Sequence, residues 1–365
     1  MQTTMLTPYT VGPDAMDILG ELFPRGSRLL VIGGKTALEK SGPALAQAAE
    51  KGGLALLGPL WYGGQCSREN MEKLTARGKE LEPQGVLGIG GGKAIDTAKG
   101  VARNLGLPLV TVPTIAATCA GVTRLSVVYQ PDGTFEGFVF HPAPPLHCII
   151  PLEIIAQAPA KYLRAGMGDA LAKHLECTLA SRGDRLNHSS AMGVALSAVC
   201  GEVTLSQGKA ALADCAAGKA GPALEQAVLG NIVTTGMVAS LVDEAYNGAV
   251  AHSVCYGLTA LPGLEERHLH GDLVAYGTLV QTALDQPEKL ASLGPALAAM
   301  GFPVSLRELG LDLGKDGTLV ETALTAALAG PDMEHLPYPV ALEDLSRAAA
   351  AVEAAGFSQG GYLNG

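Results

Sequence analysis

The sequence carries, from Gly85 to Gly100, the run GVLGIGGGKAIDTAKG. Residues 86–89 predict a short buried strand, and apolar residues then recur at helical spacing from Ala94 until Gly106 ends the pattern. Residues 90–92 are glycines that join the two elements, and residues without a Cβ atom let backbone amides close around a phosphate. The following helix points its positive dipole end at the same place. The run therefore predicts a phosphate-binding cradle.

Two common phosphate-binding patterns are not met here. A dinucleotide fingerprint would need glycine in place of Lys93, and a P-loop would need Ser or Thr in place of Ala94. The alternative is a tight turn that binds nothing, but three consecutive glycines cost more backbone entropy than such a turn requires. The next predicted strand, residues 107–112, leads into Pro113-Thr114 and a segment of small and hydroxyl-bearing residues. Open sheets bind ligands at the carboxyl ends of parallel strands, so we expect this segment beside the cradle.

An earlier strand, which starts at Arg28, ends with Gly34 and Lys35. Dinucleotide sites usually place an acidic residue there, where it binds the ribose hydroxyls of the adenosine. Without that carboxylate a 2′-phosphate is not repelled, and Lys35 offers a cation to pair with it. The pattern is therefore compatible with NADP as well as NAD, and a plain surface lysine is the alternative.

Composition bounds the class of protein. The chain has 365 residues, enough for two domains, and its hydrophobic content of 48% with only 4% aromatic residues predicts cores built from Ala, Leu and Val. A net charge of −10 without a local basic cluster argues against nucleic acid and anionic membranes as partners. Small molecules are the expected ligands.

The cysteines and the apolar runs predict a location. Seven cysteines lie scattered without C-x-x-C pairs, so neither a disulfide framework nor a zinc knuckle is expected, and a reducing cytoplasm is inferred. Residues 1–14 lack the features of a signal peptide, and no uninterrupted apolar run reaches membrane-spanning length. We expect a soluble cytoplasmic protein.

The order of predicted elements divides the chain in two. Strands and helices alternate up to the cradle, which is typical of a parallel sheet, and residues 125–129 and 135–140 predict a hairpin. After a last strand at 146–150 the pattern becomes helical. We therefore predict an α/β dinucleotide-binding domain at 1–151 and an all-helical, metal-binding domain at 152–365. Its main helices are expected at residues 158–181, 188–212, 222–246 and 270–284.

Three places in the helical half carry groups that bind metals. Asp169 follows Gly166-Met-Gly, His252 lies in a small-residue helix, and His270 starts another. One carboxylate and two imidazoles leave a zinc-type ion one open position, which is typical of a catalytic rather than a structural site. Spacing alone does not bring the three residues together.

Several segments in one order make the chain resemble the iron/zinc-dependent alcohol dehydrogenases of the dehydroquinate synthase-like fold, in their glycerol dehydrogenase branch. They are GGGKAIDTAK at 90–99, PTIAA at 113–117, LSVVY at 125–129, AGMGDAL at 165–171, AH at 251–252 and HGDLVAYG at 270–277. The resemblance implies that Asp169, His252 and His270 hold the metal. It also implies a cofactor site lined by Gly91, Gly92, Lys93, Ala94, Ile95, Asp96, Thr114, Ile115, Ala116, Ala117, Thr123, Leu125 and Tyr129.

The resemblance also implies that His174 and His268 do not bind the metal. Four-ligand, iron-type relatives carry a histidine four residues after the aspartate, where this chain has Lys173. His174 comes one step later, which turns it roughly 140° around a helix from Asp169. We expect His174 outside the metal site, and His268 in solvent or near the ligands without binding the ion. Zinc is accordingly favoured over iron on the three-ligand count.

Some positions depart from the glycerol dehydrogenase pattern. Cys119 replaces an aspartate that contacts the polyol, Cys255-Tyr256 replaces a histidine-asparagine pair, and Pro151 replaces a further aspartate. Thr118-Cys119 together with Gly34-Lys35 instead resembles a hydroxycarboxylate dehydrogenase side branch. A thiol with a pKa near 8.5 is mostly neutral and does not repel a substrate carboxylate. Arg124, in the same loop, offers a bidentate partner for an acid, or simply faces solvent.

The predicted function is hydride transfer between a small secondary alcohol, a 2-hydroxy acid or a polyol such as glycerol, and NAD(P). The alternatives are glycerol dehydrogenase proper, a sugar-phosphate cyclase or lyase on the same scaffold, and a nucleotide-binding protein without catalysis. A cyclase needs a basic cluster for a phosphate, and the helical half offers little beyond Arg164 and Lys173. Relatives associate through such helical halves, so a homo-oligomer is expected.

Overall fold

The computed structural model describes residues 6–358 and divides the chain into two compact units. The first runs to Pro159 and includes Asp214–Gly221, and the second comprises Ala160–Ala213 and the chain from Pro222 onward. The division thus falls after residue 159 rather than at the predicted residue 151, and a short later segment returns to the first unit. Each unit is described by itself below.

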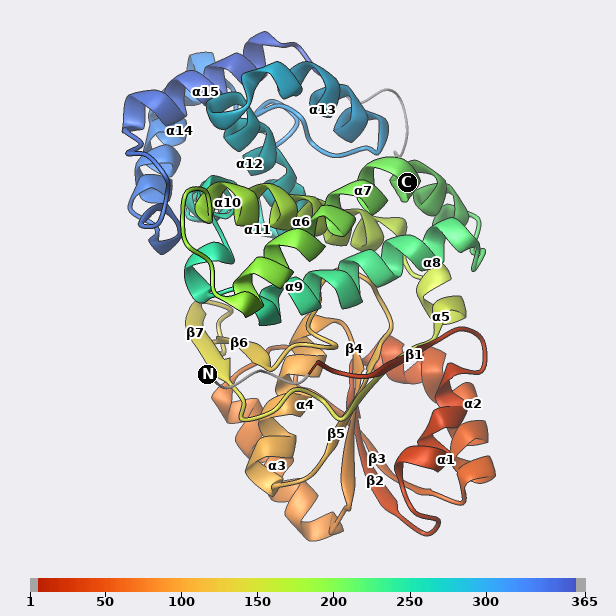
Figure 1. The fold of residues 1–365 in the computed structure, drawn as a ribbon. Coiled ribbons are helices and arrows are strands. Elements are labelled where there is room, and N and C mark those ends of the chain that lie inside the picture. Colours follow the sequence, from red (N-terminus) through yellow and green to blue (C-terminus); the bar gives the residue numbers. More distant parts are fainter. Residues whose placement is uncertain (1–5, 359–365) are drawn as a thin grey trace. The chain divides into compact units, whose positions relative to one another are not determined.

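A six-stranded parallel sheet forms the centre of the first unit, in the order β1-β8-β5-β4-β2-β3 (Figure 1). The cradle strand β4 pairs with β2 on one side and β5 on the other, which brings the ends of three predicted ligand-binding loops to one edge. The short edge strand β1 was not predicted. The strands are β1 (Tyr9–Val11), β2 (Arg28–Gly33), β3 (Ala55–Trp61), β4 (Gly85–Gly90), β5 (Leu109–Pro113) and β8 (His147–Ile150).

Helices cover both faces of this sheet (Figure 1). Successive residues of β2 point to opposite faces: Leu29 and Val31 pack with α1 (Leu19–Leu22) and α2 (Lys35–Gly52), while Leu30 and Ile32 pack with α3 (Arg68–Leu81) and α4 (Gly92–Leu105). Each fully buried Leu, Ile or Val contributes about 1.5–3 kcal/mol. Burial on both faces explains why the inner strands β2, β4, β5 and β8 are mainly apolar, whereas the edge strands β1 and β3 are partly exposed.

The predicted hairpin is confirmed. β6 (Leu125–Tyr129) pairs with the antiparallel β7 (Phe135–Phe140) as a separate two-stranded sheet. Its turn is closed by a hydrogen bond from the Gln130 amide to the Thr134 carbonyl, and Gly133 takes the positive φ of 97° that the turn requires.

The second unit is helical, so the predicted fold class is confirmed. The predicted helix at 222–246 was wrong as a single element, because it divides into α8, a π-helical turn (Gly230–Thr234), α9 and a 3-10 turn (Glu244–Tyr246). The Thr235 hydroxyl donates to the Gly230 carbonyl and the Asn231 amide to the Leu163 carbonyl, so side chains compete with the regular ladder. Helix α5 (Leu152–Ala156) and the last residues of α7, from Asp214, belong to the first unit. The other helices are α6 (Ala160–Ala180), α7 (His188–Ala216), α8 (Pro222–Leu229), α9 (Thr235–Leu241), α10 (Val250–Thr259), α11 (Leu264–Arg267), α12 (His270–Asp285), α13 (Pro287–Ala299), α14 (Leu313–Leu328) and α15 (Leu342–Ala354).

Helix α7 is apolar on average, although polar and charged residues interrupt its apolar runs. Among the described residues it alone is long and apolar enough to cross a membrane, with a mean hydropathy of 1.2 over a window that is 33% buried. Helices packed inside water-soluble proteins satisfy the same criterion. A Cβ added at Gly193 would lie 2.6 Å from Val242, and one at Gly208 would lie 2.6 Å from Met300, so α7 packs closely against its own unit at both places.

Candidate metal centre and nucleotide cradle

The glycines of the cradle are required by close approach. Gly90 has a φ of +143°, and Gly91 is the N-cap of α4, without a capping side chain in the described structure. A Cβ on Gly91 would lie 2.8 Å from the Ile115 side chain, and one on Gly92 would lie 3.0 Å from the Thr118 hydroxyl. The first turn of α4 contains no acidic residue. Its free amides and dipole therefore fit a dinucleotide phosphate.

The residues predicted to line the cofactor fall into two groups. Lys93 is exposed and its ammonium lies 4.7 Å from the centroid of the Tyr129 ring. Partly exposed positions are Gly34, Gly91, Gly92, Ile115, Ala117, Leu125 and Tyr129. Buried positions are Ala94, Ile95, Asp96, Thr114, Ala116 and Thr123.

Asp96 is engaged inside the protein. Its carboxylate accepts from the Lys99 ammonium at 2.8 Å and from the Val127 amide at 3.0 Å, and Lys99 also donates to the Leu125 carbonyl at 2.5 Å. A buried ion pair with both partners satisfied fixes the geometry around it. The pair thus fastens β6 to α4.

The ends of β2 and β3 carry the residues predicted to select the nucleotide. Gly34 is the N-cap of α2, and the Lys35 ammonium lies 4.5 Å from the centroid of the Trp61 ring. Trp61 is 48% exposed. This end of the sheet therefore presents a cation and an aromatic face, and neither would repel an additional phosphate.

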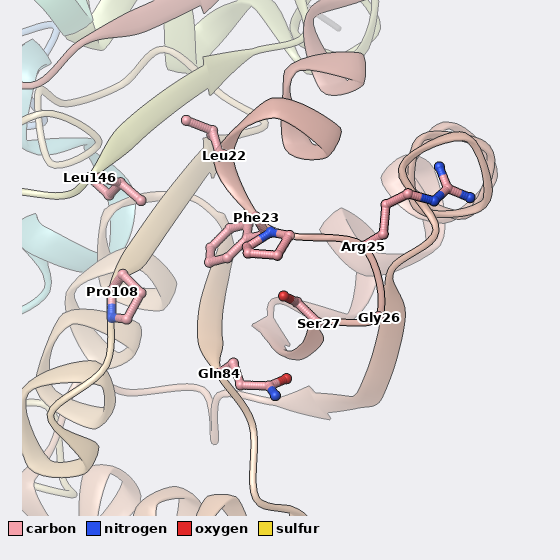
Figure 2. A pocket seen from close by; sticks show the side chains of 9 residues that line it. Leu22, Phe23, Arg25, Gly26, Ser27, Gln84, Pro108 and Leu146 are labelled. Carbon is pink, nitrogen blue, oxygen red and sulfur yellow. The ribbon is translucent and has the colours of Figure 1, made fainter.

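A separate depression of about 520 Å³ lies at the opposite ends of the strands (Figure 2). Ser27 and Gln84 in its wall directly precede β2 and β4, so it faces away from the cradle edge of the sheet. Gln84 uses its side-chain oxygen to accept the Arg28 amide. Parallel sheets bind ligands at their carboxyl ends, so we do not assign the active site here.

In the helical unit, α6, α10 and α12 bring Asp169, His252 and His270 together. The Asp169 Oδ1 lies 3.1 Å from the His252 Nε2 and 3.9 Å from the His270 Nε2, and all three donor atoms are within 4.8 Å of one another. Two imidazole nitrogens and one carboxylate oxygen are donors that a catalytic zinc-type ion accepts, with one position left open. The donor set therefore fits the metal that the sequence predicted.

Glycines beside the ligands explain how three helices come so close. A Cβ on Gly271 would overlap the Ala165 carbonyl, a Cβ on Gly168 would overlap the Gly271 carbonyl, and a Cβ on Gly277 would overlap that of Ala251. Each crossing lies within a turn or two of a ligand. Because only backbone separates the helices there, the ligand side chains converge.

The charge of the cluster also suits a cation. Burial lowers the pKa of His252, but Glu176 and Asp169 outweigh burial and raise it to about 10. Burial raises the pKa of Asp169, but His252 and His270 hold it well below its usual range. In the absence of a metal, a proton therefore supplies the positive charge that these carboxylates attract.

The other candidate histidines lie elsewhere. His174 is hydrogen bonded to the Ser197 hydroxyl at 3.0 Å, and His268 to the Leu309 carbonyl at 3.2 Å. The Lys173 ammonium donates to the Asn247 carbonyl. None of the three belongs to the donor cluster found in the described residues.

Two residues were predicted to contact substrate. Cys119 is partly buried in the loop after β5, and its carbonyl accepts the Val122 amide at 3.1 Å. Arg124 is exposed, and its guanidinium carbon lies 5.7 Å from the Phe140 ring centroid. Both belong to the first unit.

The sequence did not single out Glu176, which the structure places beside His252. The Glu176 Oε2 lies 2.5 Å from the His252 Nδ1, and its side chain is fully buried. The sequence does contain a signal for this residue. Glu176 follows Asp169 by seven positions, about two helical turns, so both side chains lie on the same face of α6.

Comparison with known proteins shows which family the chain belongs to. The model of the iron-containing alcohol dehydrogenase family matches residues 7–149. A glycerol dehydrogenase from Thermotoga maritima is 37% identical over 298 residues, which is 80% of each chain. Hydroxycarboxylate dehydrogenase A from Escherichia coli is 35% identical over 329 residues, 90% of each. The solved structure of glycerol dehydrogenase from Schizosaccharomyces pombe superimposes with a TM-score of 0.85 at 27% identity, covering 97% of this chain and 91% of that one. The chain therefore belongs to the iron-containing alcohol dehydrogenase family.

Proposed function

We propose that this metal-dependent dehydrogenase interconverts a small 2-hydroxy acid or polyol and the corresponding carbonyl compound. In the oxidising direction the carbinol C–H bond breaks, its hydride goes to C4 of the nicotinamide, and the hydroxyl proton is released to solvent. The observation that supports the proposal is the convergence of Asp169, His252 and His270, from three separate helices, within 4.8 Å.

We assign Asp169, His252 and His270 as the metal ligands. An ion held there would act as a Lewis acid toward the substrate oxygen. The three-donor set, with Lys173 bonded to Asn247 where iron-type relatives have a histidine, favours zinc over iron. Asp169 would be the only carboxylate among these three ligands, and the Glu176 carboxylate beside His252 supplies a second negative charge next to a divalent ion.

We assign the glycine cradle and the adjoining loops as the NAD(P) site. Gly91, Gly92 and the amides of α4 would hold the pyrophosphate, and the Asp96–Lys99 pair keeps β6, with Leu125 and Tyr129, in place. Lys35 and Trp61 at the adjacent strand ends favour acceptance of NADP alongside NAD.

The substrate assignment rests on Cys119. A neutral thiol there tolerates a substrate carboxylate, whereas an aspartate would repel it and would instead accept hydrogen bonds from a polyol. The similarity to a hydroxycarboxylate dehydrogenase supports this direction. Glycerol dehydrogenase proper is the alternative supported by the other relatives. A sugar-phosphate cyclase is disfavoured, because Arg164 pairs with Asp272 at 2.9 Å and Lys173 is bonded to Asn247.

The test combines metal analysis with absorbance of the reduced nicotinamide. Purified protein is assayed for bound zinc and iron, then with 2-hydroxybutyrate and glycerol, each with NADP and NAD. We expect one divalent ion per chain and turnover of the hydroxy acid, with Asp169→Asn losing both. Cys119→Asp should shift preference toward glycerol. A protein that retains metal but changes no alcohol or 2-oxo acid would contradict the proposal, and native preference for glycerol would contradict the acid assignment.

The same preparations address association. We propose a homo-oligomer, as expected from the sequence, and light scattering after gel filtration measures its mass directly.

A further inference from the structure

His252 lies between two carboxylates of a single helix. Its Nε2 is 3.1 Å from the Asp169 Oδ1, and its Nδ1 is 2.5 Å from the Glu176 Oε2. Asp169 and Glu176 share one face of α6, separated by about two turns. The imidazole therefore spans the distance between them, with one nitrogen directed to each carboxylate.

Glu176 has no remaining freedom to turn. Its second oxygen, Oε1, accepts the backbone amides of Ala249 at 2.9 Å and His252 at 2.8 Å. These amides belong to the N-terminal end of α10, where Ala249 is the N-cap without a capping side chain of its own. Glu176 thus caps α10 with one oxygen, and within the described part of the chain its other oxygen accepts from the His252 ring alone.

The second imidazole, His270, has no carboxylate at its Nδ1 among the residues that the structure describes. The Nδ1 of His270 lies 3.5 Å from the Cys255 Sγ, and a thiol is a weak hydrogen-bonding group. Two histidines of one donor cluster therefore have unequal support: a buried carboxylate for His252 and a sulfur for His270.

We infer that Glu176 is a positioning residue that fixes the tautomer of His252. By accepting from Nδ1–H, it leaves the lone pair on Nε2, which is the atom that faces Asp169 and would bind the ion. This inference rests on the proposed metal site. Glu176 would orient the ligand His252 and so contribute to the metal affinity of the site. Cys255, beside His270, would contribute much less to that affinity.

Glu176→Gln tests the tautomer with little change of shape. The amide oxygen must still accept the Ala249 and His252 amides, so the amide nitrogen faces Nδ1 and donates to it. Nδ1 then has to accept, and the ring proton moves to Nε2, where it blocks a ligand nitrogen. We expect zinc affinity, measured by competition with a chromogenic chelator, to fall roughly 10- to 100-fold.

Two control variants separate positioning from capping. Gln281 accepts the Ala251 amide at 3.1 Å on the same end of α10, and among the described residues it has no hydrogen bond to the His252 or His270 ring. Gln281→Met should lower the melting temperature while zinc affinity changes less than about twofold, because no ligand is misoriented. Cys255→Ala should weaken zinc binding by much less than Glu176→Gln.

Nitrogen-15 NMR of histidine-labelled, metal-free protein reports which ring nitrogen of His252 carries the proton. A purely structural role of Glu176 would not change that tautomer. The native His252 ring should carry its proton on Nδ1 once Nε2 has deprotonated, and the Glu176→Gln ring should carry it on Nε2. Glu176→Gln with native zinc affinity and the native tautomer would overturn the inference. If native protein binds no zinc, cobalt or iron, or if Asp169→Asn binds zinc as well as native protein does, the proposed metal site fails instead.

Discussion

At the scale of single residues, the pKa values of two buried histidines in this chain are shifted in opposite directions by the charges of their neighbours. His252 lies between two carboxylates that raise its pKa to about 10. His141 is equally buried in the α/β unit, but its Nε2 is hydrogen bonded only to the Ser126 hydroxyl, at 2.8 Å, and that hydroxyl itself donates to the Asp96 carbonyl. Its Nδ1 has no hydrogen-bond partner among the described residues. Burial, together with Lys99 and Arg103, lowers the pKa of His141 to about 4.

His141 therefore makes stability depend on pH in a defined direction. Its folded-state pKa of about 4 is below the reference value of 6.5, so the unfolded chain binds more protons between these values and acid favours unfolding. We expect up to about 3 kcal/mol of stability to be lost as the pH falls from about 6.5 to about 4. His141→Gln should flatten that part of a urea-unfolding profile. Above pH 7 native and variant proteins should differ by a constant amount, and an unchanged slope below pH 6 would contradict the assignment.

Nucleotide choice is also decided by single residues. A Cβ at Gly34 would meet only Ala37 and Tyr62, at 3.8 and 3.9 Å, so an aspartate fits there. Gly34→Asp should raise the KM for NADPH by about tenfold or more, because like charges repel, and should leave the KM for NADH unchanged or lower. Lys35→Ala removes attraction without adding repulsion, so its effect should be smaller. Equal changes for both nucleotides in steady-state assays would count against the predicted position of the 2′-phosphate.

At the scale of elements, what the sequence could predict depended on whether the signal was local. The hairpin at 125–140 was predicted to the residue because its turn and its alternating strands are encoded side by side. The interruption at Gly230–Thr234 was not, because it depends on a bond from Asn231 to Leu163, far away in the sequence. Likewise the proposed metal ligands were suggested by their residue types and by resemblance, whereas Glu176 is identified by a contact between α6 and α10.

Helix crossings at glycine make a prediction of their own. Gly271→Ala places a methyl group against the Ala165 carbonyl, so α6 and α12 must separate. We expect a loss of about 1–3 kcal/mol in the unfolding free energy of the helical unit, and weaker zinc binding, since Asp169 and His270 flank this crossing. The control is Gly317→Ala in α14, where an added Cβ meets nothing within 4 Å. That variant should be neutral or stabilised by up to about 1 kcal/mol. Native zinc affinity in Gly271→Ala would show that the close crossing does not position the ligands.

At the scale of the whole molecule, the proposed nucleotide site and the proposed metal site belong to different units of one chain. The cradle and the nucleotide-selecting residues all precede residue 159, while Asp169, His252 and His270 all lie in the second unit. The chain passes between the units after residues 159, 213 and 221. Hydride transfer needs both ligands, yet each should stabilise its own unit by mass action.

Differential scanning calorimetry can test whether metal and nucleotide each stabilise a different unit. Zinc at 100 times its dissociation constant should stabilise the helical unit by about 2.7 kcal/mol, and NADPH at the same relative concentration should stabilise the α/β unit by a similar amount. We therefore expect two transitions, of which a chelator lowers only the helical one and nucleotide raises only the other. Asp169→Asn should abolish the response to zinc and keep the response to NADPH, because the cradle is intact. A single transition that both ligands shift equally would show that the units unfold together, and that metal and nucleotide stabilise the chain as one cooperative structure.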